Sequence, residues 1–140
     1  MSLAYPLLLL LAQAGATPDA PASAPPAPEC AEPMTQQDMN YCAAREWEAA
    51  DALLNRQWRK TAEAMQARDI AARPDDGRPG YYSQLLRGQR AWLVYRDRHC
   101  ASVGYNARGG SLEPLLVADC KTALTRDRTR QLHELADWPR

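Results

Sequence analysis

The sequence has no excess of charge of either sign, because 17 basic residues balance 17 acidic ones over 140 positions. Binding to nucleic acid or to anionic membranes in general needs a clear positive excess, so the balance argues against both classes of partner. Lysine is scarce as well: Lys60 and Lys121 are the two lysines, and the other basic residues are arginine. Arginine suits fixed, bidentate ion pairs better than lysine does, so the composition is compatible with such pairs.

The sequence also lacks an apolar run long enough to cross a bilayer, which takes about 20 residues. Residues 3–14 form a shorter apolar run, and two A-x-A cleavage patterns end at Ala14 and Ala16. This arrangement is typical of a secretory signal peptide. We therefore interpret residues 1–16 as a signal peptide and expect a periplasmic or secreted protein without a membrane span.

Residues 17–29 have little that could pack, since five prolines stand among alanine and serine. Such a composition favours extended polyproline II, and we interpret the segment as a linker. The remaining residues, 30–138, are enough for one small domain.

Apolar residues recur at helical spacing in three segments of that domain. Thr35 and Asp38 form a helix-start pattern, and a stripe follows at Met39, Ala43, Trp47, Ala50, Leu54, Trp58, Ala62 and Met65. Prolines and glycines between about 67 and 82 predict a loop. A second helix is predicted from a cap at Ser83 to about Val103, ending at Gly104.

A third helix is predicted from a cap at Ser111, with Pro114 in its first turn. Its predicted inner stripe is Leu112, Leu116, Cys120, Leu124, Arg128, Leu132 and Leu135, and Pro139 ends it. No β pattern or internal repeat competes with this interpretation. The sequence thus predicts an all-α fold, a small antiparallel three-helix bundle with two disulfides.

The second helix places polar groups where a plain bundle would have leucine, because its inward stripe is Gln89, Trp92, Arg96 and Cys100. Such groups need partners. With the helices antiparallel, Asp51, Arg96 and Arg128 fall at a similar level. We predict a partly buried structural polar network of Asp51, Asn55, Gln89, Trp92, Arg96 and Arg128. The alternative is that each charge faces water, as charged side chains usually do.

Cys30, Cys42, Cys100 and Cys120 form an even set in an apparently exported small domain, which favours two disulfides over free thiols. The sequence contains no C-x-x-C pair, which is the spacing that would suggest a zinc site. All four gather at one end of the predicted bundle, and three connectivities stay geometrically open. We favour the local pairs, Cys30 with Cys42 and Cys100 with Cys120, against the alternative of Cys42 with Cys100.

No combination of residues predicts catalysis. His99 and Cys100 are consecutive, so they point in different directions on a helix, and a disulfide would consume the thiol. Glu46, Glu48 and Asp51 would need a substrate cleft, which a small bundle hardly offers. Two isolated histidines do not make a metal site. We expect no catalytic residue, no metal, no cofactor and no enzyme activity.

The motifs that run through the domain can be compared with known families as a set. They are Cys30, Thr35-x-x-Asp38-Met39-x-x-Cys42, Asp51-x-x-Leu54-Asn55, Gln89-Arg90-Ala91-Trp92-x-x-Tyr95-Arg96-Asp97-x-x-Cys100, Gly110-Ser111 and Cys120-x-x-x-Leu124-Thr125-x-x-Arg128-x-x-x-Leu132. Together, over about residues 30–135, they resemble the LprI-type lysozyme inhibitor family. The resemblance implies an exported, disulfide-linked helical domain of the cell envelope without a catalytic site. The shared positions that the helix pattern places inward transfer as determinants of the fold and not as inhibitor contacts; they are Asp51, Asn55, Trp92, Arg96 and Arg128.

The resemblance suggests a lysozyme-type muramidase as partner, bound in an inhibitory or immunity-like role. Blocking a concave cleft requires a rigid protruding element, and the loops at 73–80 and 104–110 are the two candidates. Arg73, Arg78 and Arg108 in these loops are the possible contacts to a carboxylate-bearing cleft. The alternative is a structural or stress-related envelope protein that has no inhibitory activity.

Overall fold

The computed structural model describes residues 27–72 and 75–138. The predicted signal peptide, most of the predicted linker, Arg73 and Pro139 lie outside this range. Three α-helices, α1 (Gln36–Ala71), α2 (Tyr81–Gly104) and α3 (Glu113–Asp137), make up most of the described chain, with a short 3-10 helix, η1 (Tyr105–Ala107). The described residues contain no strand. The predicted all-α class is confirmed.

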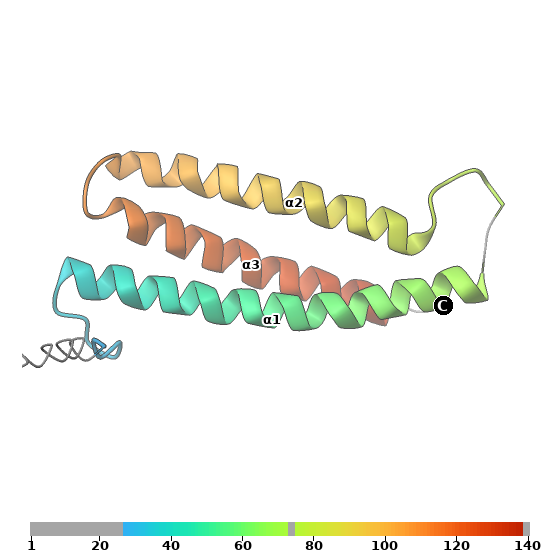
Figure 1. Ribbon diagram of the computed structural model, residues 1–140, viewed down its shortest axis with the longest axis horizontal. Coiled ribbons are helices and arrows are strands. Elements are labelled where there is room, and N and C mark those ends of the chain that lie inside the picture. Colours follow the sequence, from blue (N-terminus) through green and yellow to red (C-terminus); the bar gives the residue numbers. More distant parts are fainter. Residues whose placement is uncertain (1–26, 73–74, 139–140) are drawn as a thin grey trace, which may run out of the picture.

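The three helices lie side by side, with α2 running in the opposite direction to α1 and α3 (Figure 1). Helix α3 makes the most extensive interface with α1 and also packs on α2, whereas α1 and α2 touch each other least. Helix α2 therefore packs on both other helices, and part of its surface stays exposed. No helix of the described residues has the length and apolar character needed to span a membrane.

The start of α1 is set by the predicted capping pattern. The Thr35 hydroxyl accepts from the Asp38 backbone N–H at 3.1 Å, and the Asp38 carboxylate accepts from the Thr35 N–H at 3.1 Å. This reciprocal pair satisfies two backbone donors that a helix start otherwise leaves unpaired. The predicted stripe of α1 is buried or half-buried throughout.

The loop between α1 and α2 is shorter than predicted, because α1 continues to Ala71 and α2 begins at Tyr81. The predicted cap at Ser83 is wrong. The Asp69 carboxylate, from the end of α1, instead accepts from the backbone N–H of Tyr81 at 2.7 Å and of Tyr82 at 3.1 Å. A long-range cap of this kind leaves no local sequence signal, so the sequence pattern points to the local Ser83 instead.

Ser111 is not the cap of α3 either, since the helix begins at Glu113 with Leu112 at the N-cap position. The Ser111 carbonyl accepts from the Asn40 side-chain amide at 2.9 Å, which ties the start of α3 to α1. Pro114 lies in the first turn of α3, as predicted. Gly109 has a φ of +76°, a backbone conformation that glycine adopts without steric cost.

The predicted stripe of α3 agrees with the structure in part, since Leu132 is buried and four other members are half-buried, namely Leu116, Cys120, Leu124 and Arg128. Leu112 and Leu135 are 41% and 38% exposed, and the buried positions are Ala118, Thr122, Thr125 and Leu132. The predicted stripe omitted Ala118, Thr122 and Thr125, whose small side chains are buried. Small polar side chains can also form hydrogen bonds between the helices. The Thr61 hydroxyl on α1 donates to the Leu132 carbonyl on α3 at 2.9 Å inside the interface.

The apolar core is small. Its buried members are Leu54, Met65, Leu85 and Leu132, with Trp58, Tyr82 and Trp92 packed against them. Burying each large aliphatic side chain contributes about 1.5–3 kcal/mol. So few members make a fold of this size dependent on additional constraints.

Two disulfides supply those constraints, and both lie at the end of the bundle where α1 begins and α2 joins α3. They link Cys30 with Cys42 and Cys100 with Cys120, each with 5.5 Å between the two Cα atoms. The favoured connectivity is confirmed, and the alternative of Cys42 with Cys100 is wrong. The Cys100 side chain is fully buried, so its bond joins α2 to α3 within the core.

Candidate functional site

The inward face of α2 holds a buried cation, Arg96, whose side chain is 7% exposed. Its Nη1 donates to Asp51 Oδ1 on α1 at 3.0 Å and to the Thr125 hydroxyl on α3 at 3.4 Å. Its Nε donates to Asp97 Oδ1 at 3.0 Å. Arg96 therefore bonds to all three helices, and two carboxylates compensate its charge.

Two tryptophan rings enclose the Arg96 guanidinium. Its central carbon lies 5.2 Å from the ring centroid of Trp92 and 5.9 Å from that of Trp47. Arginine over an aromatic face gains a cation–π attraction that is larger where water is excluded. The arrangement holds the side chain in one position and makes it a structural element of the helix junction.

Arg128 forms a second polar set next to the first. Its Nε donates to Gln89 Oε1 at 2.9 Å, and its guanidinium lies 5.9 Å from the Trp92 ring centroid. Burial lowers the pKa of this guanidinium from its ordinary value. The described residues show no ion pair between Arg128 and Asp51, so Trp92 is the contact that the two sets share.

Asn55 completes the predicted set by donating to Asp51 Oδ2 at 2.9 Å. All six residues named from the sequence thus lie in two adjacent clusters, one around Arg96 and one around Arg128. Whether the two clusters act as one coupled network stays a prediction.

Sequence reasoning missed Asp97 and Lys121 as members of the Arg96 cluster. Lys121 Nζ lies 3.7 Å from Asp97 Oδ1 and 4.5 Å from the Trp47 ring centroid. The disulfide between Cys100 and Cys120 is the feature from which the proximity of Asp97 and Lys121 could have been predicted. Joining Cys100 to Cys120 brings the turn of α2 before Cys100 next to the turn of α3 that contains Lys121.

The three carboxylates considered for acid–base chemistry bind three different arginines. Glu46 accepts from Arg126 at 2.6 Å, Glu48 from Arg45 at 2.7 Å, and Asp51 from Arg96 at 3.0 Å. A pair of glycosidase carboxylates must instead face one substrate from two sides. Residues 27–72 and 75–138 also contain no group of three or more metal-ligating side chains placed to hold an ion.

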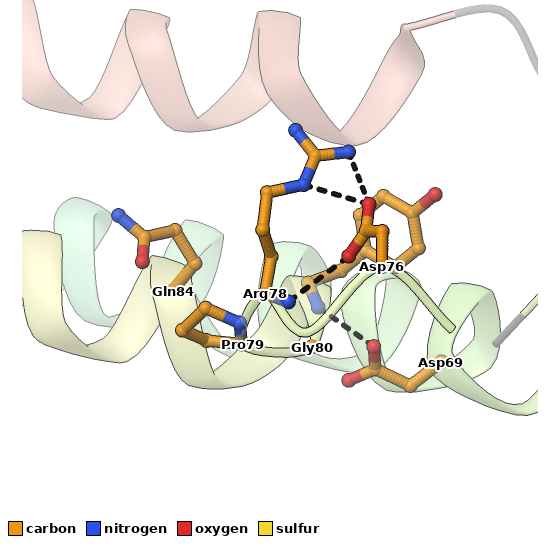
Figure 2. A pocket seen from close by; sticks show the side chains of 7 residues that line it. Asp69, Asp76, Arg78, Pro79, Gly80 and Gln84 are labelled. Carbon is orange, nitrogen blue, oxygen red and sulfur yellow. Dashed lines mark hydrogen bonds and ion pairs between the residues drawn. The ribbon is translucent and has the colours of Figure 1, made fainter. Parts of the chain in front are cut away.

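The loop between α1 and α2 borders a cavity of about 540 Å³, which Figure 2 shows from close by. Arg78 Nε donates to Asp76 Oδ2 at 2.7 Å, and its backbone N–H donates to Asp76 Oδ1 at 3.0 Å. These bonds hold the pKa of the Asp76 carboxyl below its usual value and raise the pKa of Arg78. The charge of Arg78 is therefore compensated within its own loop.

The turn between α2 and α3 presents its arginine differently. The Arg108 guanidinium lies 4.7 Å from the ring centroid of Tyr105, and both side chains are exposed. No carboxylate of the described residues forms an ion pair with Arg108. Stacking on the ring orients the guanidinium and leaves its N–H groups free for a carboxylate.

This turn is also firmly attached. Glu113 Oε2 accepts from the Gly109 N–H at 2.7 Å, and the Gly110 N–H donates to the Ala107 carbonyl at 2.8 Å. The disulfide from Cys100 to Cys120 closes the two helices on either side of it. The turn is thus short, hydrogen-bonded and flanked by cross-linked helices, and it carries one cation without an ion pair to a described residue.

Comparison with known proteins identifies the class of this domain. Residues 29–132 match the model of the family described as lysozyme inhibitor LprI. The chain belongs to this family. Both its two disulfides and its family are typical of an exported protein.

An uncharacterized protein of Rhizobium meliloti (strain 1021) is 45% identical to the chain over 120 residues, which cover 84% of this chain and 86% of the relative. No solved structure matches the chain.

Proposed function

We propose that this protein is an exported binding protein that inhibits a lysozyme-type muramidase by occluding its substrate cleft. Membership of the LprI family supports the class of partner. The protein acts as a ligand of the enzyme, in an inhibitory or immunity-like role, and carries out no catalysis of its own. No cofactor takes part in this function.

The exposed turn from Tyr105 to Gly110 is the observation that carries the proposal. A lysozyme-type cleft contains the carboxylates that cleave the glycosidic bond, and a guanidinium can bind a carboxylate through two parallel hydrogen bonds. The Arg108 guanidinium forms no ion pair with a described residue and lies on a hydrogen-bonded turn, whereas Arg78 is already bound to Asp76. Of the two loops considered from the sequence, the second is the better inhibitory element.

The proposed route to the partner is export. Residues 1–16 serve as a signal peptide, residues 17–29 as a linker, and residues 30–138 as the binding domain in the periplasm or outside the cell. The disulfides support this address, because an oxidising compartment maintains them.

The experiment adds purified protein to hen-type, goose-type and bacterial muramidases while peptidoglycan turbidity is followed, with calorimetry as a direct measure of binding. Arg108→Ala is compared with Arg78→Ala, a matched control from the other loop. We expect inhibition by the unmodified protein, a clear loss with Arg108→Ala and little change with Arg78→Ala.

Absence of both inhibition and micromolar binding across all three enzyme types would refute the proposal. The envelope-protein alternative, without inhibitory activity, would then be the better account.

A further inference from the structure

The neutral net charge of the chain conceals an uneven distribution among the helices. Helix α2 carries four arginines and one acidic residue, Asp97. Helix α1 has six acidic and five basic residues, and α3 has five acidic and four basic residues. The Asp97 side chain is 53% exposed and pairs with both Arg96 and Lys121. The other three arginines of α2 outnumber this single acidic residue and give the exposed surface of the helix an excess of positive charge.

These arginines share one exposed side of the helix. Arg87, Arg90, Val94 and Arg98 follow one another at steps of three and four residues, which places them on one face. All four are exposed, and Val94 is 62% exposed. None of the three arginines forms an ion pair with a described residue.

The same face continues into the turn described above. Tyr105 follows Arg98 after seven residues, or two helical turns, and its backbone is still right-handed helical. It is 55% exposed and carries Arg108 over its ring. We call the six residues Arg87, Arg90, Val94, Arg98, Tyr105 and Arg108 the basic strip. At 1.5 Å per residue its helical part is about 25 Å long.

Resting on the proposed function, we propose that the basic strip is the surface that binds the muramidase, with an elongated, carboxylate-lined groove of the enzyme as its counterpart. The exposed side of a helix forms a convex ridge, and a cleft for a glycan chain is long and concave. Each strip arginine then meets an acidic group, and Val94 and Tyr105 supply apolar contact between the charges.

An acidic protein groove fits the strip better than an anionic membrane does. Attraction to a charged membrane depends on positive charge summed within about a Debye length, and the slightly acidic α1 and α3 lie beside α2. Pairing with carboxylates acts at contact distance and needs no net charge. The strip also exposes Val94 and Tyr105 singly between arginines, which is little apolar surface for insertion into lipid.

The test is a charge reversal on the strip with a matched reversal elsewhere. Arg87→Glu/Arg98→Glu is compared with Arg56→Glu/Arg59→Glu, two exposed arginines of α1 that also form no ion pair with a described residue. Both variants change the net charge equally. Calorimetry measures Kd for the hen-type, goose-type or bacterial muramidase that the unmodified protein inhibits, at low and at high salt.

We expect the strip variant to weaken binding about tenfold or more and to lose most of the salt dependence of Kd, because reversed charges at an interface repel acidic partners. The α1 control stays within about twofold. Arg87→Gln/Arg98→Gln provides a milder second variant with an intermediate loss, and circular dichroism melting verifies that each variant is folded.

The outcomes separate the two proposals. If the unmodified protein inhibits and the strip variants bind as well as the control, the strip inference is overturned and the inhibitor function stands. If the unmodified protein neither inhibits nor binds any muramidase, both are overturned. Strip-dependent binding to phosphatidylglycerol vesicles, with muramidase binding independent of the strip, would assign the surface to lipid and also overturn the inference.

Discussion

Arginine has different roles on the two faces of α2. On the inner face, Arg96 is bonded to Asp51, Asp97 and Thr125 and lies between two tryptophan rings. On the outer face, Arg87, Arg90 and Arg98 are exposed and form no ion pair with a described residue. An arginine that is buried and bonded to two carboxylates inside the fold has little left for a partner. The comparison therefore separates arginines that hold the helices together from arginines that are available for binding.

The largest expected loss of stability comes from removing a partner of Arg96 on the inner face of α2. Asp51→Asn removes one of the two carboxylates that compensate Arg96, and breaking a buried pair from one side typically costs about 3–5 kcal/mol. Asp51 is partly exposed, so solvent screening reduces the loss to the lower end of this range or below. We expect the melting temperature to fall by about 10 °C or more. An effect no larger than that of the surface control Glu63→Gln would mean that the Arg96 cluster is solvated.

The coupling between the Arg96 and Arg128 clusters can be tested in the same series. If Trp92 transmits strain from one to the other, the double variant Asp51→Asn/Arg128→Gln should differ from the sum of the single variants by about 0.5 kcal/mol or more. Additive losses in urea unfolding would show two independent clusters.

A disulfide should rank next. Removing the bond between Cys100 and Cys120 by double substitution to alanine is expected to cost about 3 kcal/mol, because the bond closes a loop of 20 residues in the unfolded chain. Under mild reductant the pair of Cys30 and Cys42 should open first, since Cys30 is exposed and Cys100 is buried. Mass spectrometry after alkylation reports the order, and simultaneous opening of both bonds would contradict it.

The long-range cap of α2 should have a smaller effect. Asp69→Ala removes the acceptor of two backbone donors, and losing a helix cap costs about 1 kcal/mol. We expect the melting temperature to drop by about 4–8 °C, with Ser83→Ala nearly unchanged. Equal effects of the two substitutions would mean that the local serine, and not Asp69, stabilises the start of α2.

The smallest expected effect depends on pH. Burial, together with a weaker contribution from the Glu46 carboxylate, raises the pKa of Asp119 above its ordinary value. A carboxyl group with a raised pKa stabilises the fold below its ordinary value, and this contribution is lost as the pH rises through the folded-state value. Asp119→Asn should therefore slightly raise the melting temperature at pH 7 relative to the unmodified protein. At about pH 3, where the carboxyl group is protonated in both states, the substitution should have almost no effect.

The fold was largely predictable because its determinants are local or periodic. The cap at Thr35, the stripe of α1, and the inward positions of Gln89, Arg96 and Cys100 follow from spacing within one helix. The start of α2 was not predictable in this way, because its cap is contributed by Asp69 from another helix. The stripe of α3 was predictable only in part, because Thr122 and Thr125 are buried although neither is a large apolar residue.

The candidate site was predictable only in part, for the same reason. Arg96 and Asp51 could be brought together from their levels along the helices, but Lys121 depends on the register that one disulfide imposes. The loop arginines looked equivalent in the sequence. Three-dimensional contacts distinguish Arg78, which is bound to Asp76, from Arg108, which lies free on Tyr105.

The central claim is that the outer arginines of α2 bind the muramidase, whereas the inner arginine, Arg96, stabilises the fold. Measuring thermal melting and muramidase binding of Arg98→Glu and Arg96→Met in parallel tests this claim most directly. We predict that Arg98→Glu keeps the melting temperature within about 2 °C, as an exposed substitution should, and weakens binding. Arg96→Met should lower the melting temperature and, below that temperature, retain the Kd of the unmodified protein. Full binding by Arg98→Glu together with a loss of affinity in folded Arg96→Met would contradict the account.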